Sequence, residues 1–183
     1  EASRWGEIFA TTEPELLATG FRWTEGPTWT SKGLLFSDTI TSRIYRWDEE
    51  YREADVFLES SGGCPHGRAP GPWKCPEGQG EPGSNGMVAV SDTHVVVCQH
   101  GARRLALLDL ETREFTELAS TFGGRRLNSP NDVVHHPSDS LFFTDPYYGF
   151  LETSRFYDAP YTDEKSDLGF AGVYRLSGAG VLQ

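Results

Sequence analysis

LLFSD at residues 34–38 decides the fold, because the same pattern, an apolar run that ends in a polar step, occurs three times along the chain. The other two copies are VVVCQ at residues 95–99 and LFFTD at residues 141–145. Each copy is followed by a second apolar run, which starts five residues later in the first two copies and is delayed in the third: RIYRWD at 43–48, RLALLD at 104–109 and VYRL at 173–176. Repetition on this scale indicates the fold before any single residue is interpreted.

The spacing of the copies predicts blades of a β-propeller. Asp38 and Gln99 are 61 residues apart, and Gln99 and Asp145 are 46 apart. A Gly- and Pro-rich stretch of 22 residues, 62–83, lies in the first interval, which is 39 residues without it. A period of about 40–50 residues with several short, Val- and aromatic-rich strands is typical of propeller blades.

The predicted fold class is therefore all-β, with residues 1–183 forming a partial β-propeller domain. It divides into a first blade region at 20–61, an insertion at 62–83, a second blade at 84–125 and a third blade at 126–183. Propellers close with roughly four to eight blades, so three blades are expected to leave two apolar faces open. We expect the remaining blades to come from a longer chain or, alternatively, from a partner.

The composition limits the partners of this chain. Its formal net charge is -11, with 27 acidic and 16 basic residues, which argues against nucleic acid and anionic membrane surfaces as partners. No apolar run approaches the roughly 20 residues that span a bilayer. We expect a soluble protein, and the sequence leaves a cytoplasmic and a secreted location both open.

Two of the three cysteines lie in the insertion. Cys64 and Cys75 are close enough in sequence to form a disulfide that pins the loop, with free thiols or a zinc site including His66 as the alternatives. Cys98 lies in a strand pattern and is expected to be a small buried apolar residue.

Polar residues occur at equivalent places in the three blades. Glu25 precedes Phe36 by 11 residues, while Asn85 and Asn131 precede their matching strand residues, Val97 and Phe143, by 12. The innermost strands of a propeller line its axis, so equivalent positions of successive blades converge. One carboxylate and two amide oxygens suit Ca²⁺, Mg²⁺ or Mn²⁺, although Asn-Gly and Pro-Asn-Asp are also common turn sequences.

Taken together, the motifs of this chain resemble those of the gluconolactonase/regucalcin (senescence marker protein) family. The resemblance extends from about Phe21 to the end, and the insertion is the main departure. The motifs are EGPTW (25–29), LLFSD (34–38), RIYRW (43–47), SNG (84–86), QHGARR (99–104), RLNSPND (126–132) and FTDPYYG (143–149).

This resemblance implies a six-bladed propeller with a divalent cation, Ca²⁺ first and Mg²⁺, Mn²⁺ or Zn²⁺ as alternatives, in its central channel. By this resemblance, Glu25 and Asn131 are metal ligands and catalytic residues. Asp132, which does not contact the ion, would orient the Asn131 amide. A further Asn and an Asp, the favoured general base, come from later blades of the family, beyond Gln183.

Further candidates for substrate contacts come from polar residues near the blade ends. Asn85, by its place in the repeat, and Asn128 are two of them. His100 is alternatively a loop histidine with local hydrogen bonds, and Arg126 is expected to approach a substrate carboxylate or hydroxyl. The set of candidate substrate-binding residues is Asn85, His100, Arg126, Asn128 and Tyr147.

The implied function is a metal-dependent hydrolase that opens lactones of sugar acids, with water as the nucleophile and a small-molecule lactone or ester as the partner. An organophosphate or aryl-ester hydrolase on the same scaffold is the first alternative. A non-catalytic binding propeller is the second, and a non-functional fragment is the third.

Overall fold

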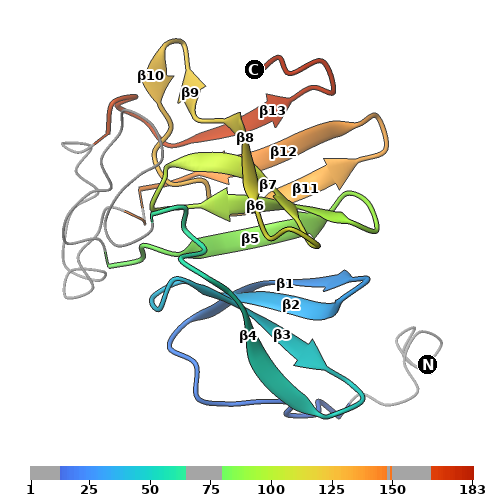
Figure 1. The fold of residues 1–183 in the computed structure, drawn as a ribbon. Helices are drawn as coiled ribbons and strands as arrows, with labels where there is room; N and C mark the ends of the chain where they lie inside the picture. The colour runs from blue at the N-terminus through green and yellow to red at the C-terminus, as the bar shows by residue number, and fades with distance from the viewer. Residues whose placement is uncertain (1–12, 65–79, 148, 150–165) are drawn as a thin grey trace, which may run out of the picture.

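The computed structural model describes residues 13–64, 80–147, 149 and 166–183. In this part of the chain the regular structure consists of strands in antiparallel pairs (Figure 1). Among the described residues there is no helix with the length and apolar character needed to cross a membrane.

Three sheets follow one another along the chain, and each is a blade in which sequence neighbours pair. The first blade contains β1 (Thr24–Thr30), β2 (Gly33–Asp38), β3 (Arg43–Asp48) and β4 (Glu53–Glu59). The second contains β5 (Ser84–Ala89), β6 (His94–Gln99), β7 (Arg104–Asp109) and β8 (Phe115–Ala119). A short hairpin follows, of β9 (Thr121–Phe122) and β10 (Arg125–Arg126), and then the third blade, of β11 (Val133–His136), β12 (Ser140–Asp145) and β13 (Gly172–Leu176).

The five-residue spacing between the two apolar runs is a turn, which connects β2 to β3 in the first blade and β6 to β7 in the second. It ends at Ser42 and at Arg103, whose backbones have φ of 55° and 58°, the left-handed region, just before β3 and β7 begin. At the other end of these strands, Asp48 and Asp109 close the following turns. One carboxylate oxygen of each accepts hydrogen bonds from the backbone N–H groups two and three residues on, at 2.8–3.2 Å.

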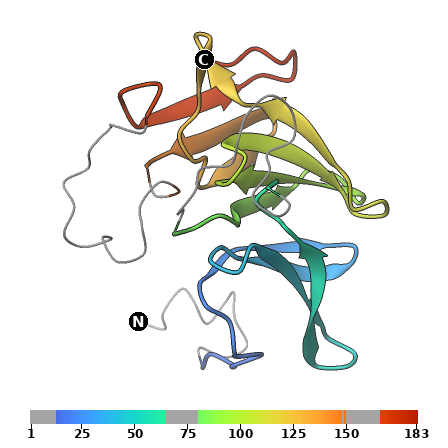
Figure 2. The same ribbon diagram turned by 60° about the vertical axis from the view of Figure 1, so that its left-hand side comes forward.

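Strand alternation buries both faces of the second blade. Val95 and Val97 of β6 pack in one cluster with Leu35 and Ile44 of the first blade. The intervening residue, Val96, belongs with Cys98 to a second cluster, which contains the third blade's core: Leu141, Phe143, Tyr174 and Leu176. Figures 1 and 2 accordingly show β5–β8 between the other two sheets, and the all-β propeller fold is confirmed.

Cys98 is the only one of these core residues with a titratable thiol. It is a free cysteine with no exposed surface, and burial raises its pKa well above the usual value. The prediction that it is a buried apolar residue is confirmed. Cys64 takes part in a disulfide, whereas Cys75 and His66 lie outside the described residues, so the Cys64–Cys75 pairing stays a prediction.

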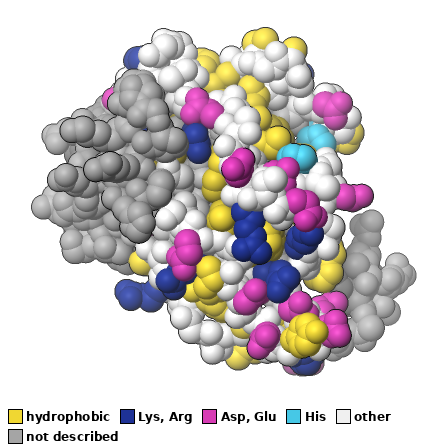
Figure 3. Space-filling view, viewed as in Figure 1, with side chains coloured by type: hydrophobic (Ala, Val, Ile, Leu, Met, Phe, Trp, Pro, Cys, Tyr) yellow, Lys and Arg dark blue, Asp and Glu magenta, His cyan; other side chains and the backbone are white. Residues whose placement is uncertain are grey.

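The outward faces of the first and third blades are apolar and partly open. On the third blade, Val134, Phe142 and Val173 are 58%, 36% and 75% exposed. On the first blade, the chain before β1 covers part of the face, since the Phe21 ring lies 4.9 Å from that of Phe36. Elsewhere on the surface, acidic and basic side chains are interspersed (Figure 3), as in the ion pairs of Arg43 and Arg46 on β3.

Candidate functional site

A cavity of about 320 Å³ lies where the inner edges of the three blades meet. We call it the axial cavity. It is lined by the first residues of β1, the first residues of β5 and the two residues that precede β11: Glu25, Gly26, Pro27, Asn85, Gly86, Met87, Asn131 and Asp132. The structure thus brings together the three side chains that the repeat places at equivalent positions.

Irregular pairing at the start of the inner strands shapes this cavity. The β1–β2 register shifts between Glu25 and Thr28, and the β5–β6 register shifts between Ser84 and Met87. A bulge at the same place in both blades bends the strand and re-aims the side chain next to it, which is the common use of bulges at functional sites.

Two glycines let the inner strands approach one another. A Cβ on Gly26, whose φ is +55°, would lie 2.4 Å from the Asn85 carbonyl oxygen. A Cβ on Gly86 would lie 2.6 Å from Asp132 Oδ1 and 2.7 Å from the Asn131 carbonyl oxygen. Both positions follow directly after a polar cavity residue, so the glycines let the blades bring those residues together.

Hydrogen bonds between blades hold the two cavity asparagines by their backbones. The Asn85 carbonyl accepts a hydrogen bond from Ser37 Oγ of the first blade at 2.8 Å. The Asn131 carbonyl accepts one from Gly86 N of the second blade at 2.7 Å. Each asparagine is therefore fixed by the blade that precedes it.

The side chains in the cavity offer hard oxygen donors. Glu25 Oε1 accepts a hydrogen bond from the Trp23 indole at 3.2 Å, and Asp132 Oδ1 accepts one from Val133 N at 2.9 Å. Within the described residues, the side-chain amides of Asn85 and Asn131 form no hydrogen bond, so the structure shows no contact by which Asp132 would orient the Asn131 amide as predicted. Two carboxylates and two uncommitted amides fit a hard divalent cation, although no group of three His, Cys, Asp and Glu side chains suited to a metal occurs in the described part of the chain.

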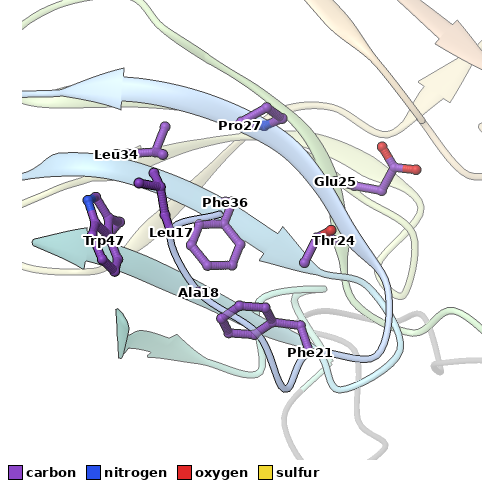
Figure 4. Close-up of a pocket in the computed structure, with 9 residues that line it drawn as sticks. All are labelled: Leu17, Ala18, Phe21, Thr24, Glu25, Pro27, Leu34, Phe36 and Trp47. Atoms are coloured by element: carbon purple, nitrogen blue, oxygen red, sulfur yellow. The ribbon is translucent and has the colours of Figure 1, made fainter. Parts of the chain in front are cut away.

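A second cavity, also of about 320 Å³, lies on the outward face of the first blade. Phe21, Phe36 and Leu17 line it, and Glu25 lies at its edge, apart from those rings (Figure 4). Glu25 therefore marks the boundary between a polar cavity and an apolar face.

Four predicted substrate-binding residues are buried away from the axial cavity. His100 is fully buried, with Nδ1 3.3 Å from a carboxylate oxygen of the buried Glu81. Arg126 is also buried and donates to the Ala102 carbonyl at 3.3 Å, and Tyr147 is 9% exposed. Of the predicted substrate contacts, only Asn85 lines the cavity in the described structure.

Asn128, the fourth, is a structural link in the third blade. Its Nδ2 donates to the carbonyls of Asp145 and Phe170 at 3.1 and 2.8 Å, and its Oδ1 accepts from Ser166 Oγ at 2.6 Å. With no exposed surface and its amide fully used, Asn128 supports the loop that leads to Asn131.

Two charged residues between the second and third blades, Asp145 and Arg103, were not predicted to have a role. Burial raises the pKa of Asp145 to about 7, against the opposing effect of the Asn128 and Ser129 backbone amides and of Arg103. Burial, together with nearby Arg126, lowers the pKa of Arg103 to about 10. Asp145 is the last residue of LFFTD, so its equivalence to Asp38 and Gln99 in the repeat is the signal that could have identified it.

Comparisons with known proteins show what this chain is similar to. A family model described as the SMP-30/Gluconolactonase/LRE-like region matches residues 23–182. A gluconolactonase of Zymomonas mobilis is 33% identical over 171 residues, which cover 92% of this chain and 44% of that protein. The chain thus spans somewhat under half the length of this curated relative.

Solved structures of other proteins share the fold. A gluconolactonase from Xanthomonas campestris matches with a TM-score of 0.67 at 28% identity, over 89% of this chain and 47% of that one. Regucalcin from Agrobacterium tumefaciens, a calcium-binding protein, matches with a TM-score of 0.55 at 16% identity, over 90% of this chain and 43% of that one.

Proposed function

Because the chain belongs to the SMP-30/gluconolactonase/LRE-like family, we propose that it contributes three blades and half of the site to a divalent-cation-dependent hydrolase that opens lactones of sugar acids. The observation that carries the proposal is the axial cavity, in which Glu25, Asn85 and Asn131 from three separate blades line one space. Propeller geometry brings any residues at these positions together, and the support for a shared role is that all three side chains offer oxygen donors to the same space.

Glu25 and Asn131 would hold the cation, and Ca²⁺ is the first candidate. The calcium-binding regucalcin has the same fold, and the oxygen donors of the cavity suit such an ion. When bound, the ion supplies a Lewis acid that polarises a carbonyl. The Trp23 N–H binds one oxygen of Glu25, and the other oxygen has no hydrogen bond among the described residues and is free to act as a ligand.

The remaining polar groups bind and orient the substrate. The Asn85 amide offers both a donor and an acceptor to ring hydroxyls, and the Asp132 carboxylate accepts hydrogen bonds from them. Only Pro27 and Met87 among the lining side chains are apolar. This polar lining favours a hydroxylated lactone over an aryl ester or an organophosphate.

We further propose that additional blades, from a longer chain or a partner, cover the two open faces and complete the cavity. The exposed apolar side chains of the third blade and the partial span of the relatives support this. The base that takes the proton from water is expected from those blades.

Replacing Glu25 with Gln tests the proposal. Glu25→Gln removes a charged oxygen donor without changing side-chain size, so Ca²⁺ affinity, measured by calorimetric titration, should fall at least about tenfold. Hydrolysis of a sugar-acid lactone should fall with it. Glu53→Gln, an exposed glutamate at the start of β4, is the matched control.

Several outcomes would contradict the proposal. Unchanged Ca²⁺ affinity in Glu25→Gln would show that Glu25 is not a ligand of the cation. Turnover of aryl esters or organophosphates in preference to lactones would favour the first alternative. Ca²⁺ binding without any hydrolysis, in a protein with all its blades, would favour a non-catalytic binding propeller.

A further inference from the structure

The second strand of every blade ends in a polar residue that is almost completely buried. These residues are Asp38, Gln99 and Asp145, and their exposed fractions are 1%, 0% and 0%. They are the last residues of LLFSD, VVVCQ and LFFTD, so the repeat makes them equivalent. A buried polar side chain is costly unless its hydrogen bonds are satisfied, so the partners of each one are informative.

In the first blade, Asp38 holds the backbone that leads to Glu25. Its Oδ2 accepts a hydrogen bond from Arg22 N at 3.0 Å, and its Oδ1 accepts one from Trp23 N at 3.2 Å. The indole of Trp23 in turn donates to Glu25 Oε1 at 3.2 Å. Asp38 is therefore connected to the cavity carboxylate through one residue.

In the third blade, Asp145 does the same for Asn131. Its Oδ2 accepts a hydrogen bond from Asn128 N at 2.8 Å, and the Asn128 side chain donates back to the Asp145 carbonyl at 3.1 Å. Asn131 follows three residues later, and its own N–H is bonded to the Thr144 carbonyl at 2.8 Å. The loop that carries Asn131 is thus tied to the end of β12.

In the second blade, an amide replaces the carboxylate and acts through a serine. Gln99 Nε2 donates to the Ser61 carbonyl at 2.8 Å, and Arg104 Nε donates to Gln99 Oε1 at 2.6 Å. Ser61 Oγ accepts a hydrogen bond from Ser84 N at 3.1 Å, one residue before Asn85. In all three blades, the last residue of the second strand therefore holds the segment that carries a cavity residue.

We propose that Asp38, Gln99 and Asp145 act as positioning residues, each fixing the segment through which its own blade presents a side chain to the axial cavity. The proposal rests on the proposed function for the identity of the ligand, a divalent cation. Beyond that function, it states that these three residues set the distances between oxygen donors on separate sheets. Because the ion takes ligands from different blades, a loosened segment on one blade weakens the whole set.

The chain contains a matched control at the opposite end of the strands. Asp109 ends β7 and also accepts two backbone N–H groups with its carboxylate, at 2.8 and 2.9 Å, but it closes a surface turn. If the role of Asp38 were only to close a turn, substitutions at Asp38 and Asp109 would have the same effect on the cavity.

The experiment compares Asp38→Asn with Asp109→Asn by calorimetric titration of Ca²⁺ into each protein. Asp38 accepts from Trp23 N and Thr41 N with Oδ1 and from Arg22 N with Oδ2, so the single acceptor oxygen of Asp38→Asn leaves at least one of these N–H groups without its partner. We expect its Ca²⁺ affinity to fall about 10- to 100-fold, the usual effect of residues that orient metal ligands. Asp109→Asn should stay within about twofold of the wild type.

The third blade offers a rescue test. Asp145→Ala removes the acceptor for Asn128 N and should lower Ca²⁺ affinity, whereas Asp145→Asn keeps an acceptor oxygen and should recover most of the loss. Amide hydrogen exchange gives a second readout that needs no ion. The Gly86 N–H, which donates to the Asn131 carbonyl, should exchange faster in Asp145→Ala and at the wild-type rate in Asp109→Asn.

Equal changes of Ca²⁺ affinity in Asp38→Asn and Asp109→Asn would overturn the positioning role. If wild-type protein binds no Ca²⁺, the proposed function fails and the positioning role is decided by exchange at Gly86. Faster exchange in Asp145→Ala alone then supports it, and unchanged exchange overturns it. Should Asp145→Ala not fold, Asp38→Asn carries both measurements, each compared with Asp109→Asn: the Ca²⁺ affinity, and the exchange rate of the Thr39 N–H, which donates to the Trp23 carbonyl.

Discussion

The second blade is buried on both faces, whereas the first and third blades are each buried on one. In β6, Val95 and Val97 contact the first blade and Val96 contacts the third, so a continuous apolar run serves two interfaces. In β12, Phe143 is 1% exposed and its neighbour Phe142 is 36% exposed. The difference shows that adjacent residues of one type have different energetic roles according to the blade that lies next to them.

The same contrast applies to the polar groups. Carboxylates at the cavity end of the blades, such as Asp145, are buried between sheets, while Asp109 at the opposite end lies on the surface. The closed interfaces therefore contain both the apolar core and the polar connections to the axial cavity. On the first blade, the Asp38 connection instead lies with the chain before β1, which covers part of the open face. Additional blades are expected at the two open faces.

Phe143→Ala and Phe142→Ala test the contrast between closed and open faces most strongly. Phe143 packs with Tyr174, ring centroids 5.2 Å apart, in the core between the second and third blades. Its removal should lower the free energy of unfolding by about 3–5 kcal/mol. The same change at the outward-facing Phe142 should cost about 0.5 kcal/mol. Chemical denaturation of both variants measures this, and equal losses would contradict the assignment of faces.

The pH dependence of stability should differ in sign between buried and surface carboxylates. The pKa of Asp145 is raised by burial to about 7, whereas an unfolded Asp has a pKa of about 3.9. Between these values the folded state retains a proton that the unfolded state has lost. The Asp145 contribution therefore falls as pH rises from about 4 to about 7, by at most about 1.4 kcal/mol per pH unit.

Asp109 has the opposite sign, because the backbone amides of Thr112 and Glu111 lower its pKa. Its contribution is present above the unfolded pKa and is lost as pH falls. Denaturation from pH 4 to pH 8 should show that Asp145→Asn gains stability relative to the wild type as pH rises, up to about pH 7. A constant difference between the two proteins across this range would show that Asp145 does not titrate there.

Much of the architecture could be predicted because it depends on local periodicity. Strand alternation, the shared five-residue turn before Arg43 and Arg104, and the spacing of the copies are all properties of short segments. The convergence of Glu25, Asn85 and Asn131 followed from the equivalence of positions between blades. Equivalent positions in a propeller meet at the axis whatever the intervening loops contain.

The partners of polar residues near the blade ends could not be predicted in the same way. His100 and Asn128 look like channel residues in sequence, yet contacts from residues 19 and 17 positions away in the chain bury them. Asp145 appears only as the end of a strand until its contact with Asn128 is known. Such roles depend on packing between segments, which no local pattern encodes.

The smallest expected effect on stability, and the most direct test of the open faces, is Phe142→Lys. Exposed apolar faces of this kind associate with other apolar surfaces, so the wild-type chain should self-associate in a concentration-dependent manner in sedimentation velocity experiments. A lysine at Phe142 places a charge in the exposed face and should shift the chain toward monomer, with the free energy of unfolding changed by about 0.5 kcal/mol. Thr116→Lys, at an exposed polar position of β8, adds the same charge outside the apolar faces and should leave association unchanged. If the wild-type chain is monomeric at every concentration, the outward face of the third blade does not mediate association. The case for additional blades would then depend on the length of the relatives alone.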